Sequence, residues 1–188
     1  LRAKRLVESE WYQNRWGDTV KMTRDQSSKM NFENTATGWR QASPFKSTTG
    51  KRGDRVIIDD PLSAKDANSE PMRNEVIETF RETIPTRVNS PEKSAIVMIM
   101  QRLHENDLIG YVLANNMGYD YLMIPMEFEP SRRVITSIGW TDPRNEEGQL
   151  MFEERFPKDV VERDKAALGP YAAAGQLQQL PVPRKGGL

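Results

Sequence analysis

The fold prediction starts from residues 52–61, which read Arg-Gly-Asp-Arg-Val-Ile-Ile-Asp-Asp-Pro. The three β-branched apolar residues at 56–58 predict a short buried strand, and Pro61, which lacks an N–H, ends its ladder. Asp59 and Asp60 therefore lie at the carboxyl end of the strand, where open α/β sheets bind their ligands. Two adjacent carboxylates suit a hard divalent cation and the water beside it. They are also typical of a plain Asp-Asp-Pro turn, and both interpretations stay open.

The segments that follow alternate between strand and helix patterns. Residues 94–100 form a continuous apolar run that predicts a strand buried on both faces, and residues 119–126 predict another strand. Apolar residues at helical spacing predict helices over 73–84 and 107–116. This alternation indicates the α/β class, with a mainly parallel sheet, right-handed crossovers and flanking helices.

The two ends of the chain differ from this central part. Residues 1–12 predict the end of an amphipathic helix, and residues 30–43 predict a β-hairpin. Prolines and glycines make residues 127–150 irregular, and a short charged helix is expected at 158–168. Residues 180–188 have the composition of a linker.

Composition excludes several classes of site. The 188 residues, 37% hydrophobic and 29% charged, are typical of a soluble globular domain. Lys plus Arg and Asp plus Glu number 27 each, so any affinity for nucleic acid needs a local basic patch. There is no cysteine, and His104 is the single histidine, which excludes thiol chemistry and zinc sites built on Cys or His. No Gly-x-Ser-x-Gly elbow and no apolar run of ~18 residues occurs, so we expect neither a hydrolase triad nor a membrane partner.

A second polar segment follows the 94–100 strand. Gln101 and Arg102 should emerge at the same carboxyl edge as the acid pair, where they could sense the γ-phosphate of a nucleotide. In the alternative interpretation, Asn106 or Asp107 caps the next helix and Arg102 pairs with a surface acid.

The sequence contains no phosphate loop. Residues 47–53, Ser-Thr-Thr-Gly-Lys-Arg-Gly, come near one. The pattern Gly-x4-Gly-Lys-Ser/Thr would need glycine at 45 and Ser or Thr at 52, where Phe45 and Arg52 stand. Because no Walker A motif occurs elsewhere either, the chain by itself cannot hold a nucleotide in the P-loop manner.

Several weak motifs, taken in their order and spacing, form a specific pattern. They are Glu-Ser-Glu-Trp-Tyr at 8–12, Phe-Glu-Asn-Thr-Ala-Thr-Gly at 32–38, the 52–61 stretch, Gln-Arg-Leu-His-Glu-Asn-Asp-Leu at 101–108, then Tyr171, Gly175-Gln176, Gln178-Gln179 and Pro-Val-Pro at 181–183. Over almost its whole length the chain resembles the large terminase subunit of tailed bacteriophages, the motor that pumps DNA into a procapsid.

The resemblance implies a partial P-loop NTPase fold of the ASCE type, with an irregular C-terminal segment. Residues 1–126 would be the C-terminal part of the ATPase core, and residues 127–179 an irregular and helical subdomain. Residues 180–188 would be the linker toward a nuclease domain that is absent from this sequence.

The resemblance also implies roles for individual residues. Asp59 is similar to the Walker B residue that holds Mg²⁺, and Asp60 takes the position of the catalytic carboxylate, which many relatives fill with Glu. Gln101 and Arg102 resemble the motif that couples hydrolysis to DNA movement, where many terminases have a Thr-rich sequence. Arg52 is a candidate for contacting phosphate or acting in trans, as are Arg40, Arg81, Arg87 and Arg102.

In the implied fold, the Walker A loop and the adenine-reading segment would precede Leu1. The P-loop strand would lie between the 56–58 and 94–100 strands, and without it both apolar strands would border a gap. We therefore expect either a preceding segment in the native protein or self-association of the chain.

The implied function is hydrolysis of Mg-ATP to move viral double-stranded DNA, with this chain inactive alone. The implied partners are DNA, the portal protein, the small terminase subunit and further copies in a homo-oligomeric ring, in the host cytoplasm and transiently on the procapsid. Two alternatives stay open. One is a Mg²⁺-dependent nuclease or phosphotransferase using Asp54, Asp59 and Asp60, and the other is a non-catalytic scaffold that binds DNA or the portal.

Overall fold

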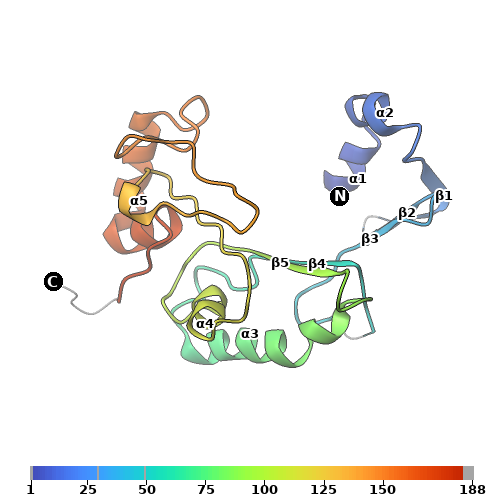
Figure 1. Ribbon diagram of the computed structural model, residues 1–188, viewed down its shortest axis with the longest axis horizontal. Coiled ribbons are helices and arrows are strands. Elements are labelled where there is room, and N and C mark those ends of the chain that lie inside the picture. Colours follow the sequence, from blue (N-terminus) through green and yellow to red (C-terminus); the bar gives the residue numbers. More distant parts are fainter. Residues whose placement is uncertain (1, 29, 49, 184–188) are drawn as a thin grey trace. The chain divides into compact units, whose positions relative to one another are not determined.

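The structure of the protein is a computed structural model that describes residues 2–28, 30–48 and 50–183 (Figure 1). It divides into two compact units, residues 1–50 and residues 51–188, and each contains its own sheet. The boundary predicted between residues 126 and 127 lies within the second unit and stays a prediction.

Two short helices begin the first unit. α1 (Arg2–Val7) and α2 (Glu10–Trp16) are separate because Ser9 caps the second helix: its side chain accepts a hydrogen bond from the Tyr12 N–H. The helix expected over residues 1–12 is therefore interrupted.

A three-stranded antiparallel sheet completes the first unit. β1 (Met22–Ser27), β2 (Asn31–Asn34) and β3 (Trp39–Gln41) lie in that order. β2 and β3 form the predicted hairpin, whose turn is fixed by Asn34, since its Oδ1 accepts from the N–H of Gly38 (2.8 Å).

A parallel pair of strands forms the sheet of the second unit. β4 (Arg55–Asp59) and β5 (Ala95–Ile99) run in register, and the predicted strands at 56–58 and 94–100 are thereby confirmed. Between them the chain crosses through α3 (Glu70–Glu82) and the 3-10 helix η1 (Ile84–Arg87). The second unit is thus a mixed α/β structure, as the sequence predicted at the level of class.

The direct pairing of β4 with β5 contradicts the expected strand order. No strand lies between them, and among the described residues this sheet has two strands only. Strands joined by a single helical crossover most often become neighbours, which is the arrangement seen here. Any further strand could pair only with an outer edge of β4 or β5.

The third predicted strand, at 119–126, is wrong. These residues belong to no strand, and at Met126 the backbone N–H donates instead to the carbonyl oxygen of Leu177 (2.8 Å). The predicted helix at 107–116 is confirmed as α4 (Leu108–Ala114) with Asp107 as its N-cap.

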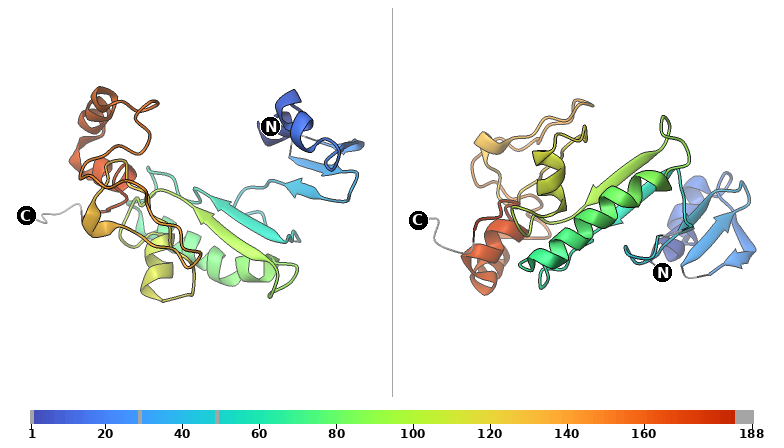
Figure 2. Two further views of the ribbon diagram at one scale, coloured as in Figure 1. Left: turned by 45° about the horizontal axis from the view of Figure 1, so that its top comes forward. Right: turned by 90° about the horizontal axis from the view of Figure 1, so that it is seen from below.

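The β4–β5 sheet buries one face and exposes the other. Ile58 is 3% exposed and shares the buried core with Val76 and Phe80 of α3, which lies along one face of the sheet (Figure 2). Ile57 and Ile99 are 62% and 55% exposed, because alternate residues of a strand point to opposite faces. The prediction that residues 94–100 are buried on both faces is therefore wrong.

This difference between faces predicts unequal effects of one substitution at neighbouring positions. Ile58→Ala should destabilise the chain by about 2–5 kcal/mol, since it empties part of a packed core. Ile57→Ala, the matched control, should cost about 1 kcal/mol or less because its side chain is mostly in water. Urea unfolding of both variants measures the difference, and equal losses would show that the two faces are equally packed in solution.

The C-terminal part of the second unit is irregular between 127 and 150, as predicted, with η2 (Pro130–Arg132) its single helical turn. Within this segment Arg144 and Asp142 form a buried ion pair, with Arg144 Nη2 2.7 Å from Asp142 Oδ2.

The last helix, α5 (Lys158–Gln176), has a kink at Gly169 and extends beyond the predicted 158–168 helix. None of the helices that the structure describes is both long and apolar enough to cross a membrane. Of the predicted linker, residues 184–188 lie outside the described residues.

Candidate functional site

The in-register pairing of β4 and β5 brings both strand ends to one edge. Asp59 lies opposite Ile99, and the Asp60 N–H donates to the Ile99 carbonyl oxygen (2.9 Å). From the end of β5, the Gln101 N–H lies 3.4 Å from Asp60 Oδ1, at the long limit of a hydrogen bond. The structure thus brings together Asp59, Asp60 and Gln101 of the predicted site.

Asp60 has an unusual backbone conformation. Its φ of 42° lies in the left-handed region, which costs a non-glycine residue roughly 1–2 kcal/mol, although Asp tolerates it better than most. Contacts with both Ile99 and Gln101 hold it there. Asp60 and Pro61 follow β4 without forming a turn, so the Asp-Asp-Pro turn of the alternative interpretation is not seen at these residues. The left-handed conformation of Asp60 places its carboxylate at the end of β5.

Asp59 presents a carboxylate available to a cation. It is exposed, and by strand alternation it lies on the same face of the sheet as Ile57. Within the described residues, no hydrogen bond or ion pair involves its carboxylate. The residues described also contain no group of three or more acidic or histidine side chains that could form a protein-only metal site. Such an edge fits Mg²⁺, which commonly takes one or two carboxylates and completes its octahedron with water and phosphate.

Arg102 lies beside this edge, but its side chain points elsewhere. Its Nε donates to Asp107 Oδ1 (3.0 Å) and Oδ2 (3.1 Å), and its Nη2 to the Glu105 carbonyl oxygen (3.3 Å). Asp107 also caps α4, as Oδ1 accepts from the Gly110 N–H (2.8 Å). This is the alternative expected from the sequence, except that the acid is fully buried. Sensing of a phosphate by Arg102 would require this ion pair to break.

His104 takes part in the same connection. Its Nδ1 accepts from the Asn106 N–H (3.0 Å). Burial lowers the pKa of His104, and the positive charge of Arg73 lowers it further, so the imidazole is neutral at pH 7. It serves here as a turn residue.

Arg52 and Asp54 are far from the acid pair. They precede β4, while Asp59 ends it, and at about 3.3 Å per residue Asp54 and Asp59 are separated by roughly 16 Å. Ligands of one metal ion lie within about 2–2.6 Å of it, so Asp54, Asp59 and Asp60 cannot bind the same ion. The predicted three-acid cluster is not formed. Arg52 likewise cannot reach a phosphate bound at Asp59 of its own chain.

The C-terminal segment also contacts this edge of the sheet, at the backbone of Arg102. Gln179 Oε1 accepts a hydrogen bond from the Arg102 N–H (2.9 Å), although the two residues are 77 positions apart. In the sequence, only the Gln-Gln dipeptide in a Pro-rich tail marked this segment as unusual. No periodic pattern could show that Gln179 bonds to Arg102.

In comparisons with known proteins, the chain matches no protein-family model and no curated protein.

Proposed function

We propose that the second unit carries the Walker B half of an ATP-hydrolysing motor of the large-terminase type, which moves double-stranded viral DNA into a procapsid. The supporting observation is the position of Asp59 and Asp60 at the carboxyl edge of a parallel strand pair, next to Gln101. This is the edge at which parallel α/β sheets bind their ligands.

In this proposal the two acids have different roles. Asp59, whose carboxylate is exposed, holds Mg²⁺, and the ion when bound supplies positive charge to the phosphate oxygens. Asp60 orients and polarises the attacking water, while Gln101 N–H restrains its carboxylate. Asp is one methylene shorter than Glu, and the left-handed backbone conformation of Asp60 sets where this shorter carboxylate lies.

A phosphate cradle has to come from outside these 188 residues, since they contain no Walker A motif. It has to approach an outer edge of the strand pair, because β4 and β5 occupy each other's inner edges.

We propose that the partners are double-stranded DNA, the portal protein, the small terminase subunit and further copies of the chain in a ring. The protein would act in the host cytoplasm and on the procapsid.

Metal removal tests the proposal. A protein that contains this chain and a phosphate loop should hydrolyse ATP with Mg²⁺, fall to the background rate in EDTA and recover when Mg²⁺ is restored. Phosphate release measures the rate, and the 188-residue chain alone is the matched control, expected to be inactive. Cleavage of DNA by the chain alone with Mg²⁺ or Mn²⁺ and no ATP would contradict the proposal.

A further inference from the structure

Two neighbouring glutamines follow α5: Gln179 bonds to the candidate site at Arg102, and Gln178 bonds to Glu127. We infer that this pair, the glutamine latch, positions the backbone at residues 101–102 and thereby the contact between Gln101 and Asp60. Its consequence for hydrolysis rests on the proposed function, whereas the contacts themselves do not.

Gln179 uses both ends of its amide. Oε1 accepts from the Arg102 N–H (2.9 Å), and Nε2 donates to the Gln176 carbonyl oxygen (2.8 Å), which fixes the orientation of the amide. The backbone of Gln179 has φ 53°, a left-handed conformation that a non-glycine residue keeps only where its surroundings enforce it. The side chain is thus held against one N–H of the strand-end segment.

The helix itself contacts the same peptide unit. At Gly175, an added Cβ would lie 2.7 Å from the Arg102 carbonyl oxygen, closer than real Cβ atoms approach. Only glycine lets α5 lie this near. Arg102 is therefore contacted by the C-terminal end of α5 at both its N–H and its carbonyl oxygen, and by Asp107 at its side chain.

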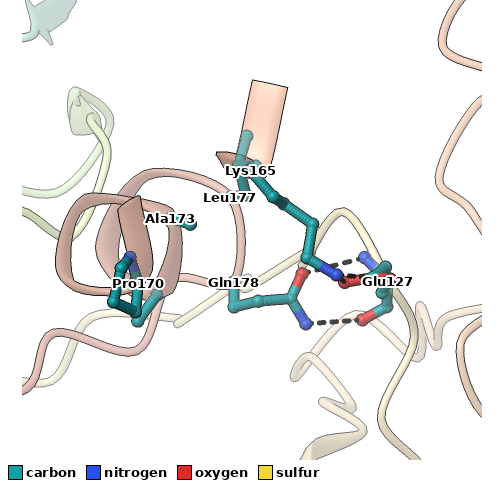
Figure 3. A pocket seen from close by; sticks show the side chains of 7 residues that line it. Glu127, Lys165, Pro170, Ala173, Leu177 and Gln178 are labelled. Carbon is teal, nitrogen blue, oxygen red and sulfur yellow. Dashed lines mark hydrogen bonds and ion pairs between the residues drawn. The ribbon is translucent and has the colours of Figure 1, made fainter. Parts of the chain in front are cut away.

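Gln178 fastens the other side of the latch. Its Oε1 accepts from the Glu127 N–H (3.0 Å) and its Nε2 donates to the Glu127 carbonyl oxygen (3.1 Å), as a neighbouring strand would (Figure 3). Arg132 Nη2 donates to the carbonyl oxygens of both Gln178 (2.9 Å) and Gln179 (3.2 Å). The latch is thus held on the 127–132 segment.

Because Gln179 is anchored in this way, a movement of the C-terminal tail would be transmitted to the backbone of Arg102. Leu180, the first residue after the latch, is still bonded to α5, since its N–H donates to the Ala174 carbonyl oxygen (2.9 Å). A displacement of the tail that moves Gln179 has to move the Arg102 N–H with it or break that bond. Gln101, one residue earlier, carries the N–H that faces Asp60.

Amide hydrogen exchange by NMR on the 188-residue chain, without nucleotide, tests this inference. Gln179→Met and Gln179→Glu both keep the length of the side chain, but only Glu keeps an oxygen that accepts from the Arg102 N–H. We expect Gln179→Met to speed exchange at Gln101 and Arg102 about tenfold and to shift the Asp60 carboxyl carbon resonance. Gln179→Glu keeps the acceptor but loses the Nε2 donor to Gln176, so it should speed exchange less than Gln179→Met.

Two controls separate positioning from general stability. Gln176→Met makes the same change one turn earlier, where the described residues give the side chain no hydrogen bond, and should alter neither amide. The amides of Ile58 and Val97, whose N–H groups face the partner strand, report on the whole sheet and should exchange at the wild-type rate in all variants. Unchanged exchange at Arg102 in Gln179→Met, or an equal increase at Ile58 and Val97, would overturn the inference. Because the exchange experiment uses no nucleotide, its outcome does not depend on ATP hydrolysis. Absence of ATPase activity in a protein that combines this chain with a phosphate loop would refute the proposed function and leave the inference about Gln179 unaffected.

Discussion

Asp60→Asn is expected to lower ATP turnover about 10²–10⁴-fold in a protein that combines this chain with a phosphate loop. Asn keeps the size of the side chain and an oxygen that can face the Gln101 N–H. It loses the negative charge with which a carboxylate polarises the attacking water. The turnover number at saturating Mg-ATP measures this step, and KM for ATP should change little because the phosphate loop binds the nucleotide.

Two further substitutions define the result. Asp54→Asn is the matched control: it makes the same change at the opposite end of β4, and turnover should stay within about twofold of wild type. Asp59→Asn should instead raise the Mg²⁺ concentration needed for half-maximal activity. If Asp59→Asn and Asp60→Asn both hydrolyse ATP at the wild-type rate, the two acids take no part in hydrolysis, and a scaffold role for this chain is favoured.

Local patterns in the sequence were sufficient for the central elements of the second unit. The β-branched run at 56–58 and the apolar run at 94–100 predicted β4 and β5, and Asp107, the first residue of the predicted 107–116 helix, is its cap. These features depend on neighbouring residues, so a linear sequence contains them. The separation of Asp54 from Asp59 also follows from the strand rise alone, and it could have excluded the three-acid cluster at once.

Features that depend on distant partners could not be predicted in this way. A continuous apolar run does not say whether one or both faces are covered, and β5 alternates between half-buried and exposed residues. Residues 119–126 have a strand pattern, but Met126 bonds to Leu177 at the end of α5. The contact between Gln179 and Arg102 spans 77 positions. In each case the outcome was decided by which segment packs alongside.

The largest effect on stability is expected at Asp107. Its side chain is 0% exposed, and four donors converge on it: the Arg102 Nε and the N–H groups of Leu103, His104 and Gly110. Asp107→Ala removes the helix cap and leaves these N–H groups unpaired. It also leaves the positive charge of Arg102, whose side chain is 13% exposed, without its partner. Breaking such a buried pair from one side costs about 3–5 kcal/mol, far more than a surface salt bridge is worth.

Urea unfolding of the chain measures this loss as a lower midpoint with an unchanged slope. Asn106→Ala, one residue earlier and exposed, is the matched control and should change stability by about 0.5 kcal/mol or less. Adding Arg102→Met to Asp107→Ala should restore part of the loss, because no buried charge is then left unpaired. If the double variant is less stable than Asp107→Ala, the Arg102 side chain stabilises the chain through contacts other than its ion pair with Asp107. If stability is partly restored, the guanidinium serves the cap of α4, and a phosphate at Asp59 and Asp60 has to be sensed by another group.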